Sequence, residues 1–155
     1  MMADITVIGI RCGSSFNDII KHFQDLGGDV ILMDPDLVCG RDHVLSAVMH
    51  AERAFEHGTN RSKSLLTETL LYAAGERQIS KALAKMRPKE GRDGMIAAVF
   101  GVKDMRLDDI NAVIDDKILG CTKDKLKNLG VTVSGTIPLD DLVLEMVATV
   151  DIQKQ

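Results

Sequence analysis

Among the side chains of this sequence that could do chemistry are three histidines at regular spacing. His43, His50 and His57 recur every seven residues. On one continuous helix they share a face, but each step climbs about 10.5 Å at about 1.5 Å of rise per residue. A single zinc or nickel ion cannot contact two side chains that far apart. The spacing therefore argues against a metal site, and nothing in the sequence indicates a cofactor.

The cysteines Cys12, Cys39 and Cys121 are odd in number, widely spaced and free of any C-x-x-C pair. This usage argues against a disulfide framework and against a structural zinc site. We expect buried thiols at these positions. Cys12 could be a nucleophile at a helix start, but no histidine or aspartate is visibly paired with it.

A turn rich in glycine and serine, Gly9–Ser15, follows the first predicted strand and precedes a helix. Glycines and hydroxyls before a helix N-terminus can bind phosphate. The turn matches neither G-x-G-x-x-G nor G-x-x-x-x-G-K-[ST], so a strand-to-helix turn with a capping serine is the favoured interpretation. A small phosphate- or metabolite-binding α/β enzyme that uses Gly9–Ser15 remains the alternative function.

Basic residues are concentrated in one part of an acidic chain. The net charge is −4, yet residues 60–92 hold eight Lys or Arg and three acids, a local charge of +5. This concentration predicts a localised anion-binding surface, and a solvated helix surface is the structural alternative. Asn60, Arg61 and Lys63 stand just before a predicted helix, where cations, amides and free N–H groups can bind phosphate and sugar oxygens.

A second basic group follows in the same window. Arg77, Lys81 and Lys85 recur at a spacing of four residues. On one helix this spacing predicts a charged ridge opposite the apolar stripe that contains Ile79 and Met86.

Short β-branched runs predict the strands that position these residues, and apolar residues at spacings of three and four predict the helices. The expected strands are Ile5–Ile10, Asp29–Asp34, Met95–Phe100 and Val131–Val133. The expected helices are Phe16–Phe23, Arg41–Glu56, Leu65–Met86 with a break or kink at Gly75, Ile110–Ile118 and Leu139–Ile152.

Length and composition predict one ordinary globular domain. The chain has 155 residues, 45% of them hydrophobic and 3% aromatic. We expect a single α/β (α+β) domain over residues 1–155, with a small mixed β-sheet covered by helices around an aliphatic core. The longest apolar run, Met95–Val102, is too short to cross a bilayer, and the start lacks the features of a secretory signal. We therefore expect a cytoplasmic protein without membrane contact.

The central run Asn60–Ala82, NRSKSLLTETLLYAAGERQISKA, resembles the signature of a known family, the Cgi-type subunit of the KEOPS complex, also called the PRPK-binding protein family. The preceding segments His43–Ala51 and Asp34–Val38 are similar to the helix and lead-in that precede this signature. The resemblance extends over roughly residues 5 to 150 and contains no catalytic motif.

The resemblance implies a non-catalytic accessory subunit of KEOPS, the assembly that makes threonylcarbamoyl-adenosine in certain tRNAs. Members of the family bind the kinase-like ATPase subunit of that complex. Archaeal-type members also help to recruit tRNA through its single-stranded acceptor end. A purely structural adaptor that binds the kinase but not RNA is the competing interpretation.

Residues can be assigned to both expected partners. We expect RNA contacts from Asn60, Arg61, Lys63, Arg77 and Lys81. An ion pair between Arg77 and Glu68 is the structural alternative for Arg77. The last predicted helix is apolar on more than one stripe, so part of it either enters the core or binds the kinase. The candidates for the kinase contact are Leu142, Leu144, Met146, Val147 and Val150.

Overall fold

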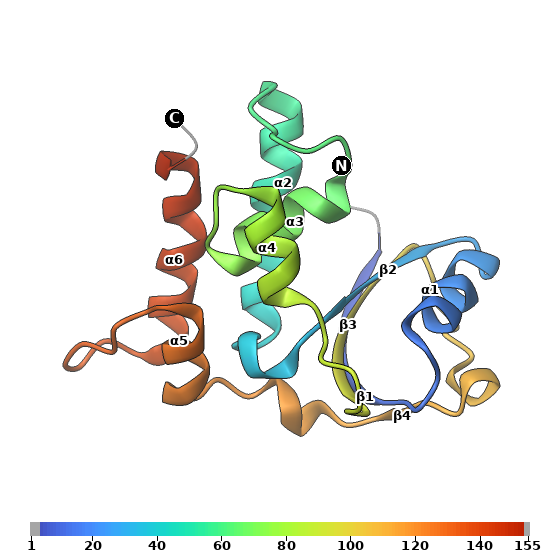
Figure 1. The fold of residues 1–155 in the computed structure, drawn as a ribbon. Coiled ribbons are helices and arrows are strands. Elements are labelled where there is room, and N and C mark those ends of the chain that lie inside the picture. Colours follow the sequence, from blue (N-terminus) through green and yellow to red (C-terminus); the bar gives the residue numbers. More distant parts are fainter. Residues whose placement is uncertain (1–3, 154–155) are drawn as a thin grey trace. The chain divides into compact units, whose positions relative to one another are not determined.

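The structure, a computed structural model, describes residues 4–153, which divide into two compact units (Figure 1). We call the first the sheet unit; it contains the chain up to Pro35 and the segment Pro88–Leu119. We call the second the helical unit; it contains Asp36–Arg87 and the chain from Gly120 onward. No helix within residues 4–153 has the length and apolar character that a bilayer crossing needs.

The sheet unit contains strands β1 (Ile5–Arg11), β2 (Asp29–Met33), β3 (Gly94–Phe100) and β4 (Val113–Ile114), with helix α1 (Phe16–Asp25) between the first two. The strand order is β2-β3-β1-β4, and each of these pairings is antiparallel. The predicted α+β class is confirmed. The sheet is not mixed as expected, because β3 inserts between β1 and β2, which run in the same direction and are joined through α1.

An apolar core lies between α1 and the sheet. Ile19 and Phe23 of α1 are buried against Ile8, Ile10 and Val99. The helix begins where predicted because the Ser15 side chain accepts a hydrogen bond from the Asp18 N–H at 3.1 Å. The serine of the Gly9–Ser15 turn is thus a helix cap.

The helix predicted over Ile110–Ile118 is wrong. The segment contains two short 3₁₀ turns, Leu107–Ile110 and Asp116–Leu119, with the two-residue strand β4 between them. Asn111 has a left-handed backbone with φ of 53°, which ends the first turn. The β-branched pair then lies against Ile10 and Arg11 of β1.

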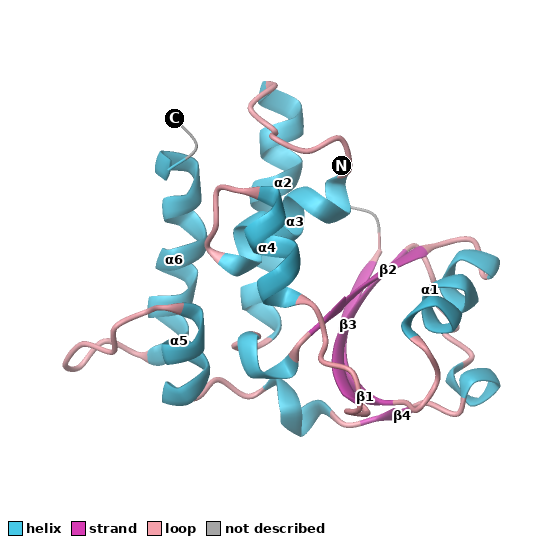
Figure 2. Ribbon diagram, viewed as in Figure 1, coloured by secondary structure: helices cyan, strands magenta, loops and turns pink. Residues whose placement is uncertain are grey.

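The helical unit contains α2 (Arg41–His57), α3 (Leu65–Ala74), α4 (Ile79–Met86), α5 (Lys123–Leu129) and α6 (Leu139–Gln153) (Figure 2). Helix α3 packs against α2, α4 and α6. The predicted break at Gly75 is confirmed: its φ of 67° ends α3, and α6 approaches so closely that a Cβ there would lie 2.8 Å from Met146 Cγ. The strand predicted over Val131–Val133 is absent, and this segment has no regular structure.

Cys39 and Cys121 form a disulfide within the helical unit, so the expectation of buried thiols is wrong for them and confirmed for Cys12. The two cysteines are separated by 82 residues, which hides their proximity in the sequence. Two hydrogen bonds support the same junction: Lys125 Nζ donates to Val38 O at 2.9 Å and Asn128 Nδ2 to Asp36 O at 3.1 Å.

Removal of the disulfide should destabilise the chain measurably. In the chain-entropy view a cross-link restricts the unfolded ensemble, so Cys39→Ser with Cys121→Ser should lower the free energy of unfolding by about 2–4 kcal/mol. Urea denaturation under non-reducing conditions measures this difference. Dithiothreitol should lower the Tm of the wild type and leave that of the double variant unchanged. Equal stability of the two proteins without reductant would contradict a cross-link in the native state.

Candidate functional site

A buried carboxylate shapes the loop that contains the first basic residues. Glu68, on the first turns of α3, is 0% exposed. Its Oε1 accepts hydrogen bonds from the backbone N–H groups of Arg61 at 3.0 Å and Ser62 at 2.9 Å, and Ser62 Oγ lies 3.1 Å from it. Such charge-assisted bonds to backbone N–H groups are strong and directional. The backbone at residues 61 and 62 is therefore fixed to α3.

Some side chains of this loop form hydrogen bonds within it, and others are exposed to solvent. Asn60 Nδ2 donates to Ser62 O at 2.9 Å, so this amide group serves the loop itself. Ser64 caps α3 by accepting from the Thr67 N–H at 3.0 Å. Arg61 and Lys63 are exposed. They are therefore the residues of this group that can contact an anion from solvent.

The ridge predicted for Arg77, Lys81 and Lys85 does not form as expected. Arg77 lies in the connection after Gly75, before α4 begins, while Lys81 lies on α4; both are exposed. Lys85 turns inward. Its Nζ donates to Ala74 O at 2.7 Å and to Leu129 O at 3.0 Å, and it lies 3.6 Å from Glu76 Oε1.

The inward turn of Lys85 has a physical reason. Ala74 and Leu129 are the last residues of α3 and α5, where helices leave carbonyl groups without intrahelical partners. An ammonium group can bind two such carbonyls and also matches the negative end of each helix dipole. The spacing of these residues in the sequence predicts that they share a helix face. It does not predict which of the lysines will bind a backbone carbonyl group.

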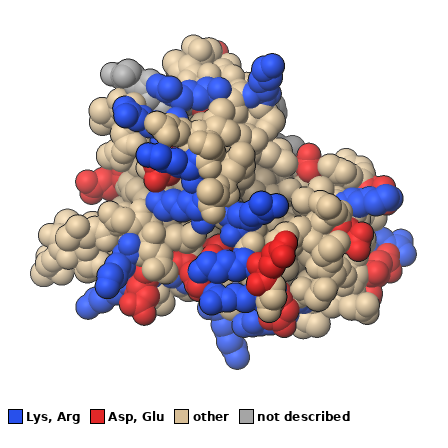
Figure 3. Space-filling view, in the orientation of Figure 1, with Lys and Arg blue, Asp and Glu red and all other residues tan. Residues whose placement is uncertain are grey.

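Further cations are exposed on the helical unit. In the view of Figure 3, several Lys and Arg side chains lie among uncharged residues in the region of α4. Arg77 and Lys81 belong to this surface, which we call the α4 basic surface. Cations at this density attract anions from solution and bind them in a salt-dependent manner.

Helix α6 exposes less apolar surface than its sequence predicts. Leu142, Val147 and Val150 are buried. They pack within the helical unit, which corrects the expectation that they form a docking surface. Leu144 and Met146 are half-buried, and the kinase contact expected of them stays a prediction. An all-round apolar helix is ambiguous in sequence because a core helix and a docking helix share the same pattern.

The Gly9–Ser15 region borders a cavity of about 500 Å³ in the sheet unit. Its hydroxyls already serve the fold, because Ser14 Oγ donates to Ile110 O at 3.2 Å and Ser15 caps α1. Gly9 lies inside β1, where a Cβ would collide with the backbone carbonyl of Asp115. The charged residues that line the cavity are Glu90, Arg92 and Asp93, so two carboxylates accompany one guanidinium. This arrangement does not resemble a phosphate cradle.

The three histidines lie on α2 in different environments. His57 is exposed. The His50 Nδ1 lies 3.1 Å from Asp151 Oδ2, and its ring stacks on Tyr72, whose hydroxyl donates to the other oxygen of Asp151. Burial, together with this hydrogen bond to the carboxylate, raises the pKa of the Tyr72 hydroxyl above its ordinary value. The cluster joins α2, α3 and α6.

His43 is buried and bridges two backbone groups. Its Nε2 lies 2.8 Å from Ala73 O and therefore donates, while its Nδ1 accepts from the Cys39 N–H at 2.9 Å. These two bonds require the neutral ring. Burial lowers the pKa of His43 from 6.5 to about 4, with smaller contributions from Lys125 and Lys85.

Comparison with known families identifies the family of this chain. Residues 15–150 match the family described as kinase binding protein CGI-121. A comparison with curated proteins finds no match. The matched region runs from the start of α1 to α6 and contains all of the candidate RNA-binding residues.

Loss of the Lys85 ammonium should destabilise the helical unit. Lys85→Met keeps most of the aliphatic stem but leaves two helix-terminal carbonyls without their donor, so the free energy of unfolding should fall by about 1–3 kcal/mol. The matched control is Lys81→Met, one turn away and exposed, which should change it by less than about 0.5 kcal/mol. Equal effects of the two variants in urea denaturation would show that the carbonyl contacts contribute nothing.

His43 should make stability depend on pH in acid. Since its pKa is about 4 in the native chain and 6.5 in the unfolded chain, the unfolded chain binds more protons between these values. Stability is therefore complete above pH 6.5 and declines as the pH falls, by about 3 kcal/mol at pH 4.

Denaturation midpoints across this range measure the effect of His43. His43→Gln should be less stable at neutral pH and should lose this part of the pH dependence. His57→Gln, exposed on the same helix, should keep the wild-type profile. An unchanged profile in His43→Gln would contradict the assignment.

Proposed function

Because the chain belongs to the CGI-121 family of kinase binding proteins, we propose that it is a non-catalytic subunit of the KEOPS complex that binds the kinase-like ATPase and recruits tRNA. In this role it serves threonylcarbamoyl-adenosine synthesis in the cytoplasm. The observation that carries the proposal is the family match over residues 15–150. The match runs through both compact units, which supports a single functional domain.

The geometry of the basic residues supports recruitment of RNA. Arg61 and Lys63 are exposed on a loop whose backbone is bonded to Glu68 at Arg61 and Ser62, and Arg77 and Lys81 are exposed at the start of α4. A backbone that is already ordered lowers the entropic cost of a phosphate contact. A single-stranded RNA end needs a few phosphate and sugar contacts, so the scarcity of aromatic side chains does not oppose this function.

Asn60 contributes to this proposed function indirectly. Its Nδ2 donates to Ser62 O, so the side chain stabilises the loop, and the phosphate contacts are assigned to Arg61 and Lys63. For the kinase, we propose that the half-buried side chains of Leu144 and Met146 on α6 contribute to the contact. The buried side chains of the same helix, Leu142, Val147 and Val150, pack it against the rest of the helical unit.

The tRNA contact is tested by anisotropy with labelled tRNA, either intact or without its terminal single-stranded nucleotides. Arg61→Glu with Arg77→Glu should weaken binding of intact tRNA by about tenfold or more, because each reversal replaces a phosphate contact by repulsion. The salt slope should fall by about one for each phosphate that no longer meets a cation. Shortened tRNA should bind the wild type as weakly as intact tRNA binds the variant.

Two controls make this result specific. Lys103→Glu with Lys117→Glu makes the same change in net charge on the sheet unit and should leave tRNA affinity nearly unchanged. Kinase binding, measured on the same proteins, should survive in all variants. If tRNA affinity does not depend on the acceptor end or on Arg61 and Arg77, the chain is an adaptor that binds the kinase alone.

A further inference from the structure

The disulfide of the helical unit joins a buried cysteine to a more accessible one. Cys39 is 2% exposed, whereas Cys121 is half-buried. Cys121 directly precedes Thr122, whose side chain caps α5 by accepting a hydrogen bond from the Lys125 N–H. A thiolate from solvent would therefore reach the sulfur of Cys121 first. This sulfur lies at the start of α5.

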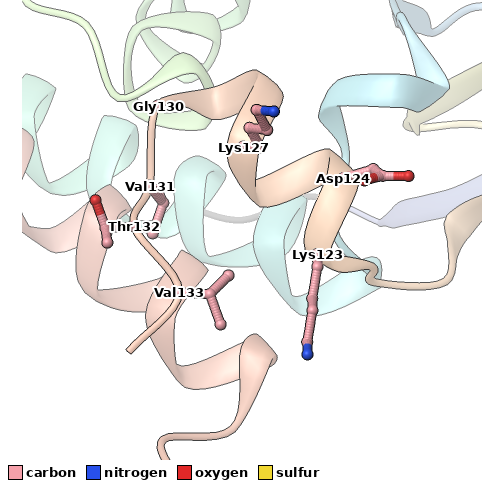
Figure 4. A pocket seen from close by; sticks show the side chains of 7 residues that line it. All are labelled: Lys123, Asp124, Lys127, Gly130, Val131, Thr132 and Val133. Atoms are coloured by element: carbon pink, nitrogen blue, oxygen red, sulfur yellow. The ribbon is translucent and has the colours of Figure 1, made fainter. Parts of the chain in front are cut away.

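Helix α5 is short, and its own packing is limited. It has seven residues, whereas an isolated helix needs about 12–15 to be even marginally stable in water. Its buried residues are Leu126 and Leu129. A pocket of about 470 Å³ is lined by α5, including the exposed Lys123 and Lys127, and by residues 130–133 (Figure 4). The stability of α5 therefore depends on the groups that attach it to the rest of the helical unit.

The disulfide and two hydrogen bonds attach α5 to the same short segment. Lys125 Nζ donates to Val38 O at 2.9 Å, and Asn128 Nδ2 donates to Asp36 O at 3.1 Å. Both acceptors belong to the segment that ends at Cys39. The covalent bond keeps this segment beside α5, and so it favours both hydrogen bonds.

Lys85 connects α5 to the helix of the α4 basic surface. Its Nζ donates to Leu129 O of α5 at 3.0 Å and to Ala74 O of α3 at 2.7 Å. Lys81 lies one turn earlier on α4, and Arg77 lies in the connection before this helix. A displacement of α5 would remove one of the two carbonyl groups that Lys85 binds. The disulfide is therefore linked through α5 and Lys85 to residues proposed for RNA.

We propose that the Cys39–Cys121 disulfide is a redox switch: its reduction loosens α5, separates Lys85 from Leu129 O and lowers the affinity of the chain for RNA. The proposal rests on the proposed function for its RNA ligand and its cytoplasmic location. Disulfides are rare in the cytosol, and those that form there are usually catalytic or redox-sensing. A permanent cross-link that only stabilises the fold is the competing interpretation.

The reductant is a protein dithiol of the thioredoxin class. Its first thiolate attacks Cys121 Sγ, which breaks the bond to Cys39 and forms a mixed disulfide, and Cys39 leaves as a thiolate. The second thiolate of the reductant then attacks the reductant's own sulfur in the mixed disulfide and releases Cys121. The chain gains two electrons and two protons as its cysteines become thiols, and the reductant becomes a disulfide.

NMR of the full-length chain labelled with ¹⁵N tests the switch without RNA. Spectra are compared before and after reduction by thioredoxin under conditions in which the chain stays folded. Reduction should shift the amide signals of α5 and also those of α4 around Lys85. The signals of α1, in the sheet unit, should stay unchanged. Cys12→Ser, which removes the free cysteine of the sheet unit, should respond to reduction as the wild type does.

The effect on RNA is measured by anisotropy with labelled tRNA. Reduction should weaken binding by about fivefold, at the lower end of usual couplings between sites. Cys39→Ser with Cys121→Ser should bind as weakly as the reduced wild type, with or without reductant. Lys85→Met should bind tRNA equally in both redox states, because it lacks the contact that couples α5 to α4. The matched control Lys81→Met should bind more weakly and keep the difference between the states.

Three results would overturn the switch. One is a reduced wild type in which the α4 signals coincide with those of the oxidised chain. Another is a disulfide that thioredoxin leaves intact in the folded chain, and a third is equal tRNA affinity in the two redox states. A chain that binds tRNA in neither state would contradict the proposed function, and the α4 signals would still decide whether the disulfide controls α4.

Discussion

The carboxylate of Glu68 is the constraint on which the candidate site depends. A carboxylate that is fully removed from water must be compensated by hydrogen bonds, since an uncompensated buried charge costs several kcal/mol. Here the compensation comes from the backbone of the loop at Arg61 and Ser62. The hydrogen bonds that compensate the buried carboxylate therefore hold the loop in place, together with the loop's own turn residues. Arg61 and Lys63 are exposed on this loop.

Helix α3, which contains Glu68, is tied to its surroundings at its other end as well. His43 binds the carbonyl of Ala73, and Lys85 binds that of Ala74. Tyr72 donates to Asp151 on α6. These groups come from α2, α4 and α6, so the polar bonds at the end of α3 define how the helical unit is assembled. The two exposed cations near the start of α4 are positioned by the same assembly.

Much of this could be predicted from the sequence where the signal is local. A serine cap before Phe16, the break at Gly75, a helix over Arg41–Glu56 and the first three strands follow from cap residues, glycines and apolar periodicity. The disulfide, the insertion of β3 and the inward turn of Lys85 depend on which distant segments meet. Local sequence patterns do not indicate which distant segments contact one another. The burial of Leu142, Val147 and Val150 was ambiguous for a related reason, because a helix covered by its own chain and a helix awaiting a partner have the same composition.

The most direct test of the central claim is the tRNA affinity of Glu68→Gln, compared with the wild type at one salt concentration and with the folded state verified by thermal denaturation. If Glu68 acts by fixing the loop, loss of its charge should weaken tRNA binding several-fold, even though a negative charge has been removed beside the RNA. Simple electrostatics predicts the opposite sign. An affinity equal to or tighter than that of the wild type, in a variant that is still folded, would contradict the account.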